Sequence, residues 1–143
     1  MKYVFSFFTL VYFSTAYAGD LQVTVNNIHN DKGYLLVSIY NDATAFKNEN
    51  VNNMHTYIAI PAKTDTQTIT LHDFPIGTYA ISILHDENKN NQFNMDKQGT
   101  PLEGYAYSNN VGLTSTPTYE QAAFKHQQDN TSVDMKLLYS VKP

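Results

Sequence analysis

The sequence predicts an all-β protein, a single antiparallel β-sandwich of about seven strands. Short segments in which apolar and polar residues alternate recur along the chain, and turn-forming residues separate them. No segment carries a sustained apolar stripe at helical spacing. The chain has 143 residues, the length of one domain. These observations indicate one layered β-domain after a targeting segment.

The expected strands follow one another with short turns between them. They cover residues 21–26, 34–40, 54–60, 66–71, 78–85, 119–124 and 132–139. His29–Gly33 predicts the turn of a hairpin between the first two, and the second is apolar enough for a central strand. Asn41–Asn53 is polar and predicts a loop with a helical turn. Phe74–Gly77 predicts a turn, because proline fixes φ and glycine permits positive φ.

Residues 1–18 predict a secretory signal peptide. Met1-Lys2 is a short positive region, Tyr3–Phe13 is apolar, and Ala16-Tyr17-Ala18 is a small-x-small cleavage site before Gly19. The apolar stretch is shorter than the roughly 20 residues that a membrane span needs. We therefore expect residues 19–143 to form one exported domain, periplasmic or secreted, without a transmembrane segment.

The composition excludes several classes of function. The chain has no cysteine, so it has no disulfide, thiolate metal site or cysteine nucleophile. Its nine basic residues are all lysine, and its net charge is −4 at pH 7. A basic face for nucleic acid is therefore not expected.

The segment 86–117 interrupts the rhythm of strands, and connections of this length inside a domain are usually functional. Its first twelve positions resemble an EF-hand-type calcium loop. The expected ligands are side-chain oxygens at positions 1, 3, 5 and 9, together with the position-7 carbonyl: Asp86, Asn88, Asn90, Asn94 and Gln92. Asn91, at position 6, tolerates the left-handed turn that the loop requires.

The loop also departs from that pattern. Lys97 stands at position 12, where a bidentate glutamate is expected, so Asp96 or Glu103 has to supply the missing carboxylate. With so few carboxylates, we expect a weak Ca²⁺ site with a Kd of about 10⁻⁴–10⁻³ M. The alternative is a solvated asparagine-rich loop without metal.

Three motifs together resemble a known family. They are Phe74-Pro75-x-Gly77-Thr78-Tyr79-Ala80 leading into His85-Asp86-Glu87-Asn88, the run from Gly99 to Asn110, and the run from Pro117 to Phe124. They resemble the bacterial exported family catalogued as domain of unknown function 2141 (DUF2141). The resemblance implies a signal peptide followed by a single transthyretin-like or immunoglobulin-like β-sandwich, and no established activity. Asn91 and Asn94 replace the family's usual glycine and aspartate, which implies weaker calcium binding in this chain.

The remaining candidates lead to two alternative functions. Tyr105, Tyr107, Asn109 and Asn110 resemble a surface that contacts a protein or glycan partner, since tyrosine combines a flat apolar ring with a polar tip. A binding module without metal is therefore the alternative. A hydrolase using Asp86 and Glu103 as a carboxylate pair ranks third. We expect no enzyme, and we expect the histidine before Asp86 to tie down residues 99–110.

Overall fold

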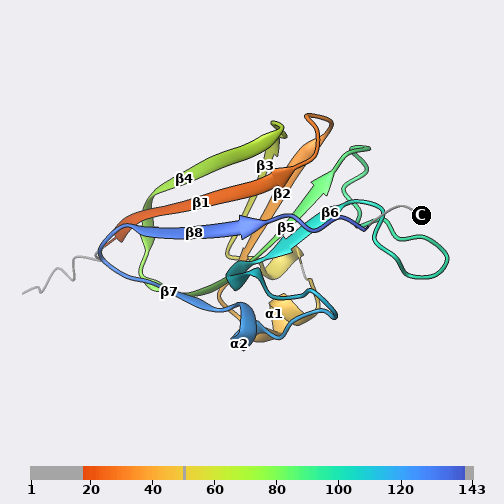
Figure 1. Cartoon of the computed structure of the whole chain (residues 1–143). Coiled ribbons are helices and arrows are strands. Elements are labelled where there is room, and N and C mark those ends of the chain that lie inside the picture. The colour runs from red at the N-terminus through yellow and green to blue at the C-terminus, as the bar shows by residue number, and fades with distance from the viewer. Residues whose placement is uncertain (1–17, 50, 141–143) are drawn as a thin grey trace, which may run out of the picture.

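The computed structural model describes residues 18–49 and 51–140, which form two packed β-sheets (Figure 1). The first sheet has the order β4-β1-β8, with β4 at Asp65–Pro75, β1 at Ala18–Ile28 and β8 at Thr131–Lys136. The second has the order β3-β2-β5-β6, with β3 at Thr56–Pro61, β2 at Tyr34–Tyr40, β5 at Gly77–Asp86 and β6 at Gly104–Tyr107. The short β7, Phe124–His126, pairs with the start of β5. The predicted all-β sandwich is confirmed.

The core lies between the inner faces of the two sheets. Leu21, Val23 and Val25 of β1 are completely buried, and the polar residues that alternate with them are partly exposed. Val37 and Ile81, from the second sheet, belong to the same buried cluster. The period-two pattern therefore identified the inner face of β1, because successive side chains of a strand point to opposite faces.

β2 differs from β1 because it is buried on both faces, and only Tyr34 at its start is exposed. Its outer face, which includes Tyr40, is covered by a second apolar cluster that contains Phe46 and Tyr107. The continuous apolar run of β2 reflects this double burial, as expected for a central strand.

One strand pair is parallel, contrary to a purely antiparallel sandwich. β1 is antiparallel to β4, with Thr24 opposite Thr68, but it is parallel to β8. β7 runs back along the start of β5, with His126 opposite Gly77. This carries the chain to the end of the molecule where β1 begins, so β8 follows β1 in the same direction (Figure 1).

The helices among the described residues are short. They are α1 (Ala43–Lys47), η1 (Val51–Asn53), η2 (Ser108–Asn110) and α2 (Tyr119–Ala122). α1 confirms the helical turn predicted between the second and third strands. Within the described part of the chain, no helix has the length and apolar character to cross a membrane.

The strand predicted at residues 119–124 is wrong over most of its length. Thr118 and Gln121 form a capping box, in which each side chain bonds the backbone of the other, and this starts α2. The strand, β7, begins only at Phe124. A local capping signal therefore prevailed over a weak alternating pattern.

β6 lies inside the segment predicted as one long connection. It pairs with β5, with Ala106 opposite Ile83. A Cβ on Gly104 would lie 2.4 Å from the ring of Tyr139, so glycine allows the C-terminal segment to pack against this strand. The irregular connection between β5 and β6 is thereby shortened to residues 87–103. The predicted signal peptide lies outside the described residues except for Ala18, where β1 begins.

Candidate functional site

β5 positions the predicted calcium loop, and its last two residues, His85 and Asp86, are fully buried. His85 Nε2 lies 2.8 Å from the carbonyl oxygen of Lys32, which can only accept, so Nε2 carries the proton. His85 Nδ1 then accepts from the Tyr139 hydroxyl at 2.6 Å. The side chain of His85 thus anchors the β1–β2 turn and the C-terminal segment. The expectation that this side chain ties down residues 99–110 is wrong.

Asp86 organises the first turn of the loop. Its Oδ1 accepts the N–H of Asn90 at 3.1 Å, and its Oδ2 accepts that of Asn91 at 2.9 Å. Lys89 and Asn91 have positive φ values of 65° and 57°. The predicted left-handed turn at Asn91 is therefore confirmed, and asparagine is among the residues that adopt it most readily.

Three asparagine amides converge beside Asp86. Nδ2 of Asn88 and Nδ2 of Asn90 donate to Oδ1 of Asn94 at 2.8 and 3.0 Å. The Oδ1 atoms of Asn88 and Asn90 each accept one backbone N–H, the second of these from Gln92. Because an amide oxygen has two lone pairs, the Oδ1 atoms of Asn88 and Asn90 can each accept one more bond. Gln92 itself is exposed.

Glu103 completes this group, and its side chain is only 4% exposed. Its Oε2 accepts the N–H of Asn94 at 3.2 Å, while its Oε1 is buried without a hydrogen-bond partner among the described residues. Burial raises the pKa of Glu103, and the charge of Asp86 adds to the rise. The only ion pair in the described part of the chain, Asp20 with His72, lies elsewhere. Within the described residues, no basic side chain forms an ion pair with Asp86 or Glu103.

Asp96 belongs to a separate turn. Its Oδ1 accepts the N–H groups of Gln98 and Thr100 at 2.9 and 2.8 Å. The hydrogen bond from Thr100 is the main cause that lowers the pKa of Asp96. This turn doubles the chain back so that Glu103 lies next to Asn94. Of the two carboxylates expected as the missing ligand, Glu103 therefore lies with the other candidate oxygens.

We call this group the oxygen cluster; it consists of Asp86, Asn88, Asn90, Asn94 and Glu103. Among residues 18–49 and 51–140, no three or more Asp, Glu, His or Cys side chains come together as a metal-binding group. The cluster instead combines two carboxylates with three amides. This donor set suits Ca²⁺, which accepts amide and carbonyl oxygens, and does not suit metals that prefer imidazole or thiolate.

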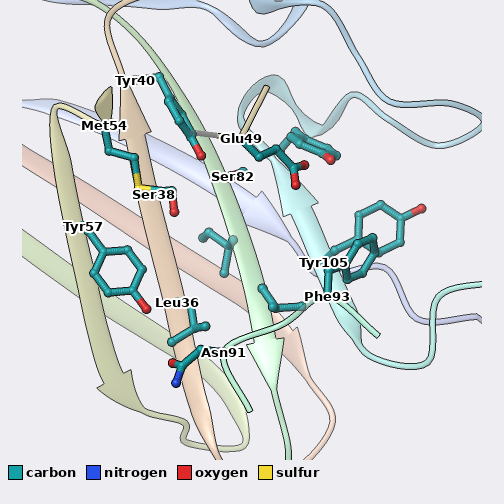
Figure 2. A pocket seen from close by; sticks show the side chains of 13 residues that line it. Leu36, Ser38, Tyr40, Glu49, Met54, Tyr57, Ser82, Asn91, Phe93 and Tyr105 are labelled. Atoms are coloured by element: carbon teal, nitrogen blue, oxygen red, sulfur yellow. The ribbon is translucent and has the colours of Figure 1, made fainter. Parts of the chain in front are cut away.

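A groove of about 420 Å³ lies over the outer face of the second sheet (Figure 2). Leu36 of β2 and Leu84 of β5 line it within the sheet, and Tyr57 of β3 stands along one side. Tyr105 of β6 and Phe93 of the β5–β6 connection stand opposite, with their ring centroids 5.5 Å apart. We call this cavity the outer-face groove.

The polar groups of the outer-face groove gather near Tyr40. Ser38 and Ser82 are opposite each other in register. Burial raises the pKa of the Tyr40 phenol, and both serines lower it against that larger effect. Burial raises the pKa of Tyr107 to about 12, and the charge of Glu49 is the second cause. Glu49 is the only charged side chain that lines the groove among the described residues. The groove therefore combines tyrosine rings, two hydroxyls and one carboxylate.

The four residues predicted as a partner surface have different surroundings. Tyr105 and Tyr107 line the outer-face groove. The Asn109 amide donates to two backbone carbonyls at the end of α2, at 3.0 and 2.9 Å. The Asn110 amide bonds backbone groups of β8 at 3.0 and 2.8 Å. The two asparagines therefore fasten η2 to its neighbours. Tyr105, which is partly exposed, and Tyr107, which is buried against Phe46, line the groove.

Sequence reasoning missed most of the groove. Glu49 and Tyr57 lie in segments interpreted only as a polar loop and a strand. The available signal was Ser38 and Ser82, each a small polar residue inside an otherwise apolar central strand. Two such residues paired across neighbouring strands leave room on that face.

The family described as "Uncharacterized protein conserved in bacteria (DUF2141)" matches the chain over residues 23–134. The match includes the oxygen cluster and all residues named above as lining the outer-face groove. No curated protein and no solved structure is significantly similar to the chain.

Proposed function

The chain belongs to the DUF2141 family of uncharacterised bacterial proteins, and from this premise we propose that it is an exported, non-catalytic β-sandwich protein whose β5–β6 connection is ordered by Ca²⁺. The observation that carries the proposal is the Oε1 of Glu103, which is buried beside Asp86 and has no hydrogen-bond partner among the described residues. Residues 1–18 support export, since they have the layout of a signal peptide.

The first argument is electrostatic. Asp86 is completely buried and Glu103 nearly so, and no described lysine or histidine pairs with either. Burying charge without a partner is costly, and two nearby carboxylates repel each other. A divalent cation would neutralise both groups and give Oε1 of Glu103 the partner that it lacks.

The second argument is ligand chemistry. Ca²⁺ takes six to eight oxygen ligands from carboxylates, amides, backbone carbonyls and water. Asp86, Glu103 and the three amides of the oxygen cluster offer such oxygens on one short segment. Asn94 Oδ1 would have to exchange its two amide donors for the ion, which supports weak affinity.

The third argument links affinity to location. A Kd of about 10⁻⁴–10⁻³ M is typical of extracellular calcium modules. A site of this strength would fill outside the cytoplasm, where a signal peptide would send the protein. Bound calcium would then hold residues 87–103 against β5 and β6, in a chain that has no disulfide to do so.

Two other functions have less support. A hydrolase using Asp86 and Glu103 is disfavoured, because both side chains are buried and accept backbone N–H groups. A binding module without metal is supported by the outer-face groove, and it is compatible with a calcium-ordered loop.

Thermal unfolding in EDTA and in excess Ca²⁺ tests the proposal. At a tenfold excess over Kd, binding should stabilise the fold by about 1.4 kcal/mol, which raises the midpoint by a few degrees. Glu103→Gln should lose this shift. In EDTA the same variant should be at least as stable as wild type, because it removes a buried charge that lies next to Asp86.

Glu87→Gln is the matched control, since Glu87 is the second residue of the same loop but its Oε2 accepts from the Asn30 side chain and it is not a member of the oxygen cluster. It should keep the calcium shift. A wild-type midpoint that is the same in EDTA and in Ca²⁺ would overturn the proposal, and so would a full shift in Glu103→Gln.

A further inference from the structure

We propose that the outer-face groove binds a small alkylammonium compound, a cationic amine seated between tyrosine rings with Glu49 as its counter-charge. This inference goes beyond the calcium proposal and does not depend on it. Glu49, Tyr40, Tyr57 and Tyr107 all line the groove, and only Asn91 and Phe93 come from the β5–β6 connection.

The backbone of Glu49 supports a functional role for this residue. Glu49 follows the end of α1 with a left-handed φ of 46°, and its N–H bonds the carbonyl of Phe46 at 3.2 Å. Glycine or asparagine usually fills this position, because other residues are strained there. A carboxylate is also on the unfavourable, negative end of a helix. Strained residues of this kind concentrate at functional sites.

The carboxylate of Glu49 is exposed and forms no ion pair with a described basic side chain. Its surroundings in the groove are the rings and hydroxyls described above. Its charge instead raises the pKa values of Tyr107 and Tyr40, for which burial is the larger cause. Both phenols therefore stay neutral, and Glu49 is the one negative charge that the described residues bring to the groove, beside electron-rich rings.

These features favour a cationic ligand for the groove. Ammonium groups are attracted to the faces of tyrosine rings within about 6 Å, and a nearby carboxylate adds to the attraction. An anionic ligand would meet the charge of Glu49 and a protein of net charge −4. A neutral sugar could stack on the tyrosines but would leave that charge without a counter-ion.

The rest of the groove fits a small molecule with a polar end. Its volume of about 420 Å³ falls in the usual range of small-molecule pockets. Ser38, Ser82 and Tyr40 bring three hydroxyls to the same groove as Glu49. A hydroxyl or second amine on the ligand would bond there.

Calorimetric titration of the full protein in EDTA tests the inference without calcium. The probes are choline, spermidine and lysine, with the neutral analogue of choline in which carbon replaces nitrogen. We expect at least one cation to bind, and the neutral analogue to bind at least about tenfold more weakly than choline if choline is that cation.

Variants then locate the site. Glu49→Gln should weaken binding of the cation about tenfold, since it removes one charge–charge contact. Tyr105→Ala should also weaken it. Glu120→Gln is the control, because Glu120 lies on the exposed surface of α2 outside the groove, and it should bind the cation like wild type. The Glu49→Gln variant should fold, because Glu49 is exposed.

Three results would overturn the inference. One is that none of the three cations binds up to about 10 mM. Another is that Glu49→Gln binds the cation as tightly as wild type. The last is that glucose or maltose binds with an affinity that Glu49→Gln does not change, which would assign the groove to a neutral sugar. Each of these results is independent of the calcium shift, because calcium is absent.

Discussion

The two sheets present very different outer faces. The outer face of β4-β1-β8 is bare, and its polar side chains include Thr24 and Thr68, whose hydroxyls lie 3.2 Å apart across the strands. The outer face of β3-β2-β5-β6 is covered around Tyr40 by α1 and α2, and Asn91 and Phe93 of the β5–β6 connection line the outer-face groove on the same face (Figures 1 and 2).

The difference comes from the connections. The bare face has period-two strands and needs nothing above it, because every second residue is polar. The covered face has apolar residues on both sides of β2, so the chain must place further segments over it. Glu49 lies just after α1, and the oxygen cluster runs from Asp86, the last residue of β5, into the β5–β6 connection. Both candidate sites thus belong to the sheet that needed a second layer.

The largest predicted effect contrasts the two faces directly. Phe46→Ala should lower the free energy of unfolding by about 3–5 kcal/mol, because Phe46 is 4% exposed and its ring packs on those of Tyr40, Tyr107 and Tyr119. Thr68→Ala on the bare face should cost less than about 1 kcal/mol. Urea unfolding of both variants measures the contrast, and equal losses would contradict it.

The next effect is a loss of stability at high pH. Burial raises the pKa of Tyr107 from the ordinary tyrosine value of 10.0 to about 12 in the fold. Above pH 10 the unfolded chain loses a proton that the folded protein keeps, so stability is complete below pH 10 and falls as the pH rises toward 12. Tyr107→Phe should make this fall shallower in urea unfolding.

Tyr34→Phe is the control for the alkaline experiment, since Tyr34 is 36% exposed. A slope that changes equally in both variants would show that burial of Tyr107 is not the cause. Tyr139, whose pKa burial also raises to about 12, contributes in the same direction.

The smallest effect connects the two proposals. Asn91 and Phe93 line the outer-face groove and also belong to the connection that calcium would order. Calcium should therefore strengthen binding of the cationic probe by about two- to fivefold. Repeating the titration in Ca²⁺ measures this, with Glu103→Gln as the variant that should show no gain. If calcium still strengthens cation binding in Glu103→Gln, the effect does not pass through the calcium loop, and the predicted coupling between loop and groove is wrong.

The sequence predicted the central strands well because their side chains report burial directly. The alternation of Leu21, Val23 and Val25 and the apolar run of β2 reflect one-sided and two-sided burial. It failed at residues 119–124, where the Thr118–Gln121 capping box forms a helix, and at β6, whose pairing with β5 depends on contacts distant in sequence.

The candidate sites were predictable to different degrees. The loop residues Asp86, Asn88 and Asn90, predicted as ligands, follow one local pattern, so their convergence could be predicted. That Glu103 rather than Asp96 lies beside them depends on the turn that Asp96 caps. The groove joins β2, β3, β5 and β6, and no local pattern indicates which residues those strands bring together.

The most direct test of the central claim is a calcium titration followed by amide NMR. The account predicts that added Ca²⁺ shifts the backbone resonances of residues 86–94 and 103 most strongly, at a Kd of about 10⁻⁴–10⁻³ M, and that Glu103→Gln abolishes these shifts. Resonances of this loop that stay in place at calcium concentrations well above that range would contradict it.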